Sequence, residues 1–162
     1  MNLVLGGLPS LVLLAMFTPL CVSLQCDTTL RKLVYHGPNF ATAQDRLKLM
    51  KKCITITGTI VSASRESDGG YHIRVRVDPQ FKNLLNGKNN IGQKGFLVVE
   101  PMCAKKPTQQ DTVDEGVCNG FKQALFKASM RDNHVSVTGD YVQDMEHGWR
   151  EIHPVTSITV AP

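Results

Sequence analysis

Two segments far apart in this sequence repeat one pattern, in which a glycine interrupts an alternation of apolar and polar residues. The first reads Ile-Thr-Gly-Thr-Ile-Val over residues 56–61, and the second reads Val-Thr-Gly-Asp-Tyr-Val over residues 137–142. An alternation with a period of two residues is typical of a half-buried strand. A glycine inside such a strand indicates a bulge or a sharp bend. Two glycine-bent strands in corresponding positions are what a small, strongly curved barrel needs to turn its corners.

Further strand patterns bring the expected number of strands to five. The expected strands occupy residues 53–63, 71–78, 96–100, 134–142 and 149–158. A helical segment is expected over residues 108–126, between the third and fourth strands, and this order is that of the OB-fold, a five-stranded Greek-key barrel. An immunoglobulin-like sandwich is the alternative, but it requires more strands and a tryptophan between paired cysteines. We therefore expect a mainly β fold, a five-stranded OB-like barrel with a helical segment between strands 3 and 4.

The segments between and within these strands carry more local signals. A short helix is expected over residues 41–50, and residues 67–70 read as a hairpin turn because two glycines accept a positive φ. Residues 79–94 form a polar excursion, in which Phe81, Leu84 and Leu85 are expected to anchor the chain to the domain. Pro154 must lie at an edge or a break of the fifth strand, because proline cannot donate to the ladder. In the second strand we expect core positions at Tyr71, Ile73, Val75 and Val77.

The beginning of the chain reads as a signal for export. Residues 3–24 are apolar, Pro19 lies near the end of the run, and Cys21 and Ser23 are small residues that suit a signal peptidase. We predict a signal peptide at 1–24, an N-terminal extension at 25–52 and a single domain at 53–162. An uncleaved membrane anchor is the alternative, because the run is long enough to span a bilayer. Both readings predict a secreted or cell-surface protein outside the cytoplasm.

The cysteines agree with an oxidising compartment, because four of the five follow the predicted signal peptide and can pair. Cys103 and Cys118 enclose a short polar stretch and are the first expected disulfide. Cys26 and Cys53 then form the second. A zinc site is the competing reading, but the spacing contains no Cys-x-x-Cys knuckle.

The end of the chain carries a longer motif. Residues 137–155 read Val-Thr-Gly-Asp-Tyr-Val-Gln-Asp-Met-Glu-His-Gly-Trp-Arg-Glu-Ile-His-Pro-Val. Here the chain resembles an uncharacterised family of small exported OB-like β-barrel proteins of archaea and bacteria, which share a C-terminal Val-Thr-Gly-x-Tyr-Val-x-Asp-x-x-His-Gly-Trp-x-Glu-Ile-His-Pro-Val signature. The resemblance extends over the segment from Cys53 to Ile158 and implies a β-barrel domain, but it implies no activity. Gly70 stands where the family has an acidic residue, which argues against a metal role for that turn.

Polar side chains are densest near the last strand, at Asp144, Glu146, His147, Glu151 and His153. In a strand, Trp149, Glu151 and His153 share one face, and His72 and Glu100 lie on strands that can approach it. One interpretation is a divalent metal site in a small hydrolase acting on phosphodiesters. Its ligands are expected at His72, His147, Glu151 and His153. The other interpretation is a carboxylate–imidazole network that fixes the end of the barrel and needs no cofactor.

A second group of residues suggests a binding face. His72, Arg74 and Arg76 alternate along the second strand, and Trp149 is the only tryptophan. An exposed tryptophan on an OB-like face can stack on a sugar or a base. The alternative is that Trp149 plugs the end of the barrel. The net charge is only +4, whereas nucleic-acid-binding domains usually carry a stronger basic signal, so nucleic acid is a weakly supported partner.

The function that the sequence favours is an exported OB-like binding or structural module, not an enzyme. No catalytic residue is assigned, because no nucleophile motif occurs and the cysteines are better used in disulfides. The ligand is an unknown extracellular or cell-surface molecule, and membrane contact is expected only through an uncleaved signal segment.

Overall fold

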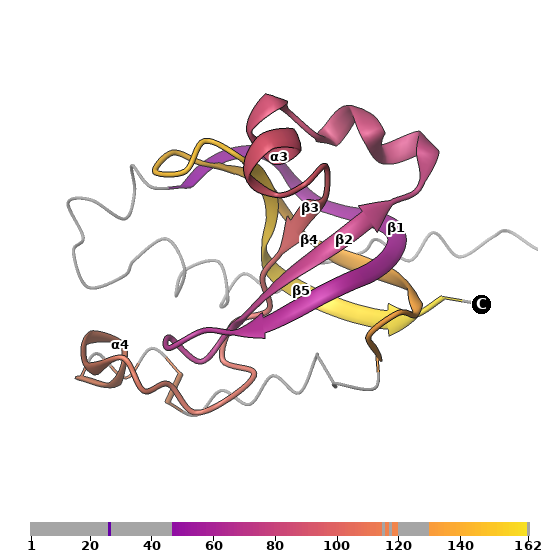
Figure 1. Ribbon diagram of the computed structural model, residues 1–162. Coiled ribbons are helices and arrows are strands. Elements are labelled where there is room, and N and C mark those ends of the chain that lie inside the picture. Colours follow the sequence, from indigo (N-terminus) through magenta and orange to yellow (C-terminus); the bar gives the residue numbers. More distant parts are fainter. Residues whose placement is uncertain (1–25, 27–46, 115, 117, 120–129, 162) are drawn as a thin grey trace, which may run out of the picture.

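Five strands form one mixed sheet that closes in a ring, in the order β1–β2–β3–β5–β4 (Figure 1). The computed structural model of the chain describes residues 26, 47–114, 116, 118–119 and 130–161. The strands are β1 (Leu47–Arg65), β2 (Tyr71–Val77), β3 (Leu97–Val99), β4 (His134–Asp144) and β5 (Arg150–Val160). The protein is therefore mainly β, as the alternating patterns predict. The predicted signal peptide and most of the predicted extension lie outside the described residues.

Neighbouring strands in the ring are antiparallel with one exception. β3 and β5 pair in parallel, with Val98 opposite Glu151 and Val99 opposite Ile152. The same pair continues beyond β3, because the Glu100 amide donates to the Ile152 carbonyl at 3.0 Å. This parallel pair joins the end of β3 to the beginning of β5, and the candidate site lies there.

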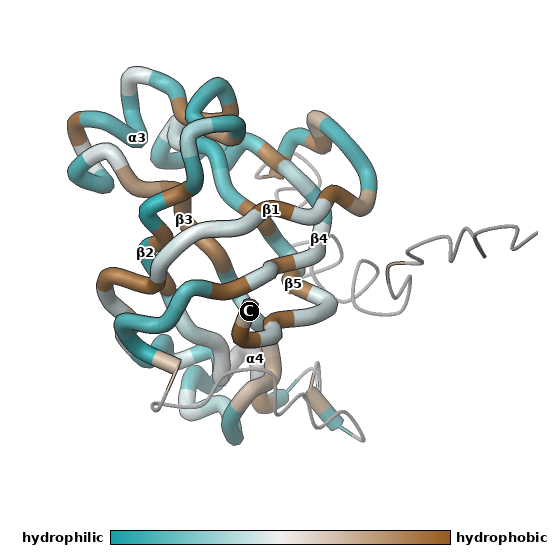
Figure 2. Tube along the Cα trace, turned by 90° about the vertical axis from the view of Figure 1, so that its right-hand side faces the viewer, coloured by the Kyte–Doolittle hydropathy of each residue, from teal (hydrophilic) through white to brown (hydrophobic). Residues whose placement is uncertain are grey.

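Alternation along β2 separates the core from the outer surface as predicted. Tyr71, Ile73, Val75 and Val77 are buried in the core cluster. On the outer face His72 and Arg74 are partly buried and Arg76 is exposed. The hydropathy colours of Figure 2 show apolar segments along the strands and a mostly hydrophilic segment around α3.

The first strand begins earlier than predicted. Residues 47–50 are strand, so the helix expected over residues 41–50 is wrong for these four residues, and residues 41–46 lie outside the described part. Leu47 is buried and pairs with Asp144, and Leu49 pairs with Val142. Pairing with β4 gives these residues backbone partners and a buried face, which outweighs the weak helical pattern.

The two glycines of the repeated pattern lie where backbones approach closely. A Cβ added to Gly58 would lie 2.5 Å from the Arg76 carbonyl oxygen, and one added to Gly139 would lie 2.5 Å from Cγ2 of Ile152. The pairing of β4 with β5 also shifts register on both sides of Gly139. Glycine is required at both positions because a side chain has no room there.

Two helical segments follow β2 where the sequence predicts only a polar excursion. They are the 3-10 helix η1 (Pro79–Leu84) and the helix α3 (Gly87–Gly92). The predicted anchors Phe81, Leu84 and Leu85 do pack against the core. A further short helix, α4 (Gln110–Asp114), lies between β3 and β4, and most of the remaining predicted helical segment is outside the described residues. Figure 1 shows α3 and α4 at opposite ends of the ring.

Turns and breaks in the strands follow their sequence signals. Gly69 has a φ of 91°, and the Glu66 amide donates to the Gly70 carbonyl to close the predicted hairpin. The His153–Pro154 peptide bond is cis. Pairing of β5 with β4 shifts register between Ile152 and Val155, so the predicted break at Pro154 is confirmed.

Both predicted disulfides are present. Cys26 is joined to Cys53, and Cys103 is joined to Cys118. Two disulfides indicate an oxidising environment outside the cytoplasm. Among the residues described, no helix combines the length and the apolar character that a membrane crossing requires.

Candidate functional site

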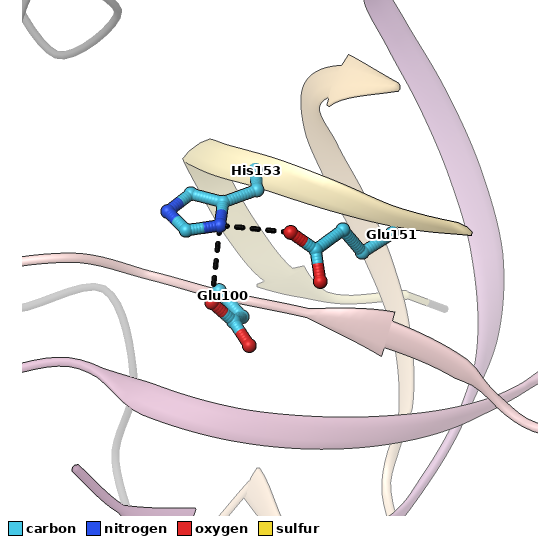
Figure 3. A group of neighbouring side chains, drawn as sticks. All are labelled: Glu100, Glu151 and His153. Atoms are coloured by element: carbon cyan, nitrogen blue, oxygen red, sulfur yellow. Dashed lines mark hydrogen bonds and ion pairs between the residues drawn. The ribbon is translucent and has the colours of Figure 1, made fainter. Parts of the chain in front are cut away.

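A cluster of two carboxylates and one imidazole lies where β3 and β5 run side by side. Glu100 directly follows β3, and Glu151 and His153 are alternate residues of β5. The parallel pairing brings the three side chains together from the two strands (Figure 3). We call Glu100, Glu151 and His153 the carboxylate–imidazole cluster.

Both carboxylates of the cluster approach the same ring nitrogen. Nδ1 of His153 lies 3.0 Å from Oε2 of Glu100 and 3.0 Å from Oε1 of Glu151. The side chain of Glu151 is 1% exposed, that of His153 is 6% exposed and that of Glu100 is 16% exposed. An N–H group has one hydrogen, so a single donor faces two buried acceptors.

The other oxygen of each carboxylate is held by a donor on the outer side. Nδ1 of His72 lies 3.0 Å from Oε1 of Glu100, and Nε1 of Trp149 donates to Oε2 of Glu151 at 3.0 Å. The orientation of both carboxylates is therefore fixed from two sides. Sequence reasoning placed Glu100 near this face but did not include it among the metal ligands.

The cluster shifts the pKa values of its members in opposite directions. Burial alone lowers the pKa of His153, but the charges and hydrogen bonds of Glu100 and Glu151 outweigh it and raise that pKa to about 10. Burial raises the pKa of Glu100, but His153 and His72 outweigh it and hold that pKa well below its usual value. Burial and the charge of Glu100 raise the pKa of Glu151. The cluster thus strongly attracts positive charge to Nδ1.

The second ring nitrogen of His153 has no such partners. Nε2 is buried and has no hydrogen-bond partner among the described residues. Figure 3 shows this nitrogen on the side of the ring that faces away from both carboxylates. A buried N–H without an acceptor costs free energy, and the cost is larger when the ring is charged.

Gln93, which lies at the end of α3, connects the cluster to the outer face of β2. Its Oε1 lies 3.1 Å from Nε2 of His72 and accepts from Nε of Arg74 at 2.7 Å. The hydrogen bond to Glu100 raises the pKa of His72 against the opposing effect of burial. His72 thus belongs to the hydrogen-bond network around the cluster, and Arg74 is tied to it through Gln93.

Helix α3 owes its position to two asparagines that sequence reasoning missed. Asn86 caps the helix, and its Nδ2 donates to the Gly148 carbonyl at 2.9 Å. Asn89 is fully buried and bonds both the amide and the carbonyl of Arg150. The spacing Asn86-x-x-Asn89 was the available signal, since asparagine is a favoured N-cap.

An aromatic pair lies on the turn between β4 and β5. The rings of His147 and Trp149 stack with centroids 4.2 Å apart and an interplanar angle of 8°. Nδ1 of His147 lies 2.9 Å from Oδ2 of Asp144, and the side chain of His147 is 43% exposed. The rings of His72 and Trp149 meet in a T-shaped arrangement at a centroid distance of 6.1 Å. Trp149 is therefore oriented from several sides while its stacked partner faces solvent.

The predicted site residues separate into two groups. Of the predicted metal ligands, Glu151 and His153 are in the cluster, His72 contacts it through Glu100, and His147 instead pairs with Asp144. Of the predicted binding face, His72 and Trp149 are in contact and Arg74 is linked through Gln93. Arg76 lies apart, with its guanidinium 5.7 Å from the centroid of the Phe96 ring.

Comparisons with protein families, with curated proteins and with solved structures found no match to this chain.

Proposed function

We propose that this chain is an exported, non-enzymatic binding module built on an OB-like barrel, and that it binds an acidic carbohydrate at the cell surface or outside the cell. The strand order, the close backbone approach at two glycines and the position of α4 between β3 and β4 support the OB-like description. The two disulfides and the apolar residues 3–24 support export through a signal peptide.

The observation that carries this proposal is an aromatic pair that is connected to Arg74 through His72 and Gln93. Trp149 stacks on His147 and donates to Glu151, so its ring is positioned before any ligand arrives. Arg76 is exposed. Among the described residues, the guanidinium group of Arg74 is hydrogen-bonded only through Nε. An aromatic ring can stack on a sugar ring while guanidinium groups bind carboxylates or sulfates.

The modest charge favours a carbohydrate over a nucleic acid. The net charge is +4, and a protein that binds through many phosphates carries a more clustered basic signal. A single-stranded polynucleotide is therefore the comparison ligand in the test.

A metal-dependent hydrolase is less well supported. A hydrolytic metal needs an open position for water and substrate. In the cluster the side chains of Glu151 and His153 are 1% and 6% exposed. The burial favours a structural or metal-holding cluster over a catalytic centre.

The test uses the single tryptophan as its reporter. Fluorescence of Trp149 is followed while a heparin-derived oligosaccharide or oligodeoxythymidylate is added to the intact oxidised protein. We expect the oligosaccharide to quench the fluorescence with saturation, and the Arg74→Ala/Arg76→Ala variant to bind it roughly tenfold more weakly or worse, since charged hydrogen bonds are lost.

The matched control is Lys51→Ala/Lys52→Ala, which removes two exposed charges from β1. An equal loss of oligosaccharide affinity in both double variants would mean that only net charge matters. It would contradict a binding face at Arg74 and Arg76. Tighter binding of the oligonucleotide would replace the carbohydrate with nucleic acid, and saturation by neither ligand would overturn the proposal.

A further inference from the structure

The carboxylate–imidazole cluster presents three potential metal ligands around one point. Nδ1 of His153, a carboxylate oxygen of Glu100 and one of Glu151 all lie within 4.8 Å of one another. When both carboxylates are ionised they carry two negative charges, and a proton on Nδ1 compensates only one of them. The cluster is thus suited to a cation of higher charge.

The two distances from Nδ1 of His153 match those between neighbouring ligands of one metal ion. Metal–ligand bonds of about 2.1 Å place two ligands about 3.0 Å apart at right angles and about 3.4 Å apart in a tetrahedron. Nδ1 of His153 lies 3.0 Å from the nearest oxygen of each glutamate. The same distances suit hydrogen bonds, but one hydrogen cannot serve both oxygens fully, whereas a metal ion can.

The surroundings of the cluster resemble the outer shell of a metal site. His72 holds the second oxygen of Glu100, and the Trp149 indole N–H holds the second oxygen of Glu151. Donors of this kind orient metal-binding carboxylates and sustain their affinity. Each glutamate therefore directs one fixed oxygen to the centre.

The unpartnered Nε2 of His153 bears on the charge that the buried ring can carry. A proton on Nδ1 alone leaves Nε2 as a buried lone pair. A second proton makes the ring an imidazolium, with a charged N–H at Nε2 that has no acceptor among the described residues. A metal on Nδ1 leaves the ring neutral, and a neutral buried N–H is less costly. The unpartnered Nε2 thus disfavours the imidazolium and is compatible with a metal ion on Nδ1.

We propose that Nδ1 of His153 and one carboxylate oxygen each of Glu100 and Glu151 bind a divalent transition-metal ion such as Zn²⁺ or Mn²⁺. The mixed oxygen and nitrogen donors suit these ions. The ion displaces the hydrogen from Nδ1 and releases it as a proton to solvent. Access is from the side of Glu100, whose side chain is 16% exposed. The ion links β3 to β5 at their parallel pair.

The first experiment is calorimetric titration of the intact, oxidised, chelator-treated protein with Zn²⁺ and with Mn²⁺. We expect one equivalent to bind and to raise the melting temperature. Glu100→Gln and Glu151→Gln each keep the side-chain shape, and each is expected to weaken binding at least tenfold.

The matched control is Asp78→Asn, because Asp78 forms a carboxylate–imidazole pair with His134 outside the cluster. It is expected to bind like the unchanged protein. Absence of one-to-one binding would overturn the proposal and leave a proton-linked network. So would glutamine variants that both bind the ion as tightly as the unchanged protein.

A second measurement needs no variant and so does not depend on folding of the mutants. Trp149 is the only tryptophan, and its indole N–H bonds the glutamate proposed as a ligand. One equivalent of Mn²⁺ is expected to broaden the single indole N–H resonance in the NMR spectrum. An unaffected resonance at saturating Mn²⁺ would place the ion elsewhere and contradict the site.

This inference does not rest on the proposed carbohydrate ligand. The Arg74 and Arg76 substitutions leave all three proposed ligands in place, and the Glu100→Gln substitution leaves both arginines in place. Failure of one proposal is therefore measured separately from failure of the other.

Discussion

Asp78 joins two strands at the end of β2. Oγ1 of Thr57, on β1, donates to the Asp78 carboxylate. Nε2 of His134, the first residue of β4, lies 3.0 Å from the same carboxylate. The hydrogen bond from Thr57, followed by that from His134, lowers the pKa of Asp78 below its usual value of 3.8. These contacts stabilise the ionised carboxylate in the folded state.

Because the pKa of Asp78 is lowered in the folded state, its contribution to the free energy of unfolding decreases as the pH falls. The contribution of Asp78 is complete above the unfolded-state pKa of 3.8 and is lost as the pH falls from there through the lowered folded-state value. We expect Asp78→Asn to flatten this part of the curve of unfolding free energy against pH. Urea unfolding between pH 6 and pH 2 measures it, and parallel curves for both proteins would contradict the assignment.

Individual site residues could be predicted only where they lie in a strand with a clear alternating pattern. The sequence indicated His72, Glu151 and His153 because each lies in a clear alternating strand. Asn89 and Gln93 were not identified, because their partners are distant in sequence and become neighbours only when α3 docks on β2 and β5. A local pattern contains no information on such docking.

At the level of strands and helices, the two glycines of the repeated pattern are the positions where we expect a side chain to be tolerated least. Gly58→Ala places a methyl group 2.5 Å from a backbone oxygen and 2.7 Å from Cγ1 of Val75. We expect a loss of about 2–3 kcal/mol in unfolding free energy, because β1 and β2 must move apart. Thermal and urea unfolding both measure this loss.

Gly87→Ala is the control for that substitution. Nothing lies within 4 Å of a Cβ at this position of α3, so we expect stability to change by no more than about 0.5 kcal/mol. A Gly58→Ala protein as stable as Gly87→Ala would show that the strands can separate at no cost.

The strands were predictable because their alternation is local, but two features of the elements were not. The first residues of β1 have a weak helical pattern and become strand only because β4 lies beside them. Helix α3 is only six residues long and is held by Asn86 and Asn89, so no amphipathic repeat reveals it. Both features depend on tertiary contacts that outweigh local preference.

At the level of the whole molecule, the two disulfides close loops of different length. The sequence separation is 27 for Cys26–Cys53 and 15 for Cys103–Cys118. Loop-closure entropy predicts stabilisation of about 3.5 and about 3 kcal/mol respectively. We expect the Cys26→Ser/Cys53→Ser variant to lose slightly more stability than the Cys103→Ser/Cys118→Ser variant.

Urea unfolding of both variants under oxidising conditions measures these losses. The control is the protein with all four cysteines replaced, whose stability should not respond to a reducing agent. Full wild-type stability in either double variant would contradict a stabilising role for that disulfide.

The pairing order of the ring has a consequence for how the chain folds. β1, β2 and β3 follow one another as antiparallel neighbours, and β4 and β5 form a separate hairpin. Two seams join these parts, β1 with β4 and β3 with β5, and both pair residues far apart in sequence. Long-range pairing forms late because loop-closure entropy must first be overcome. We therefore expect the two halves to assemble before the seams between them close.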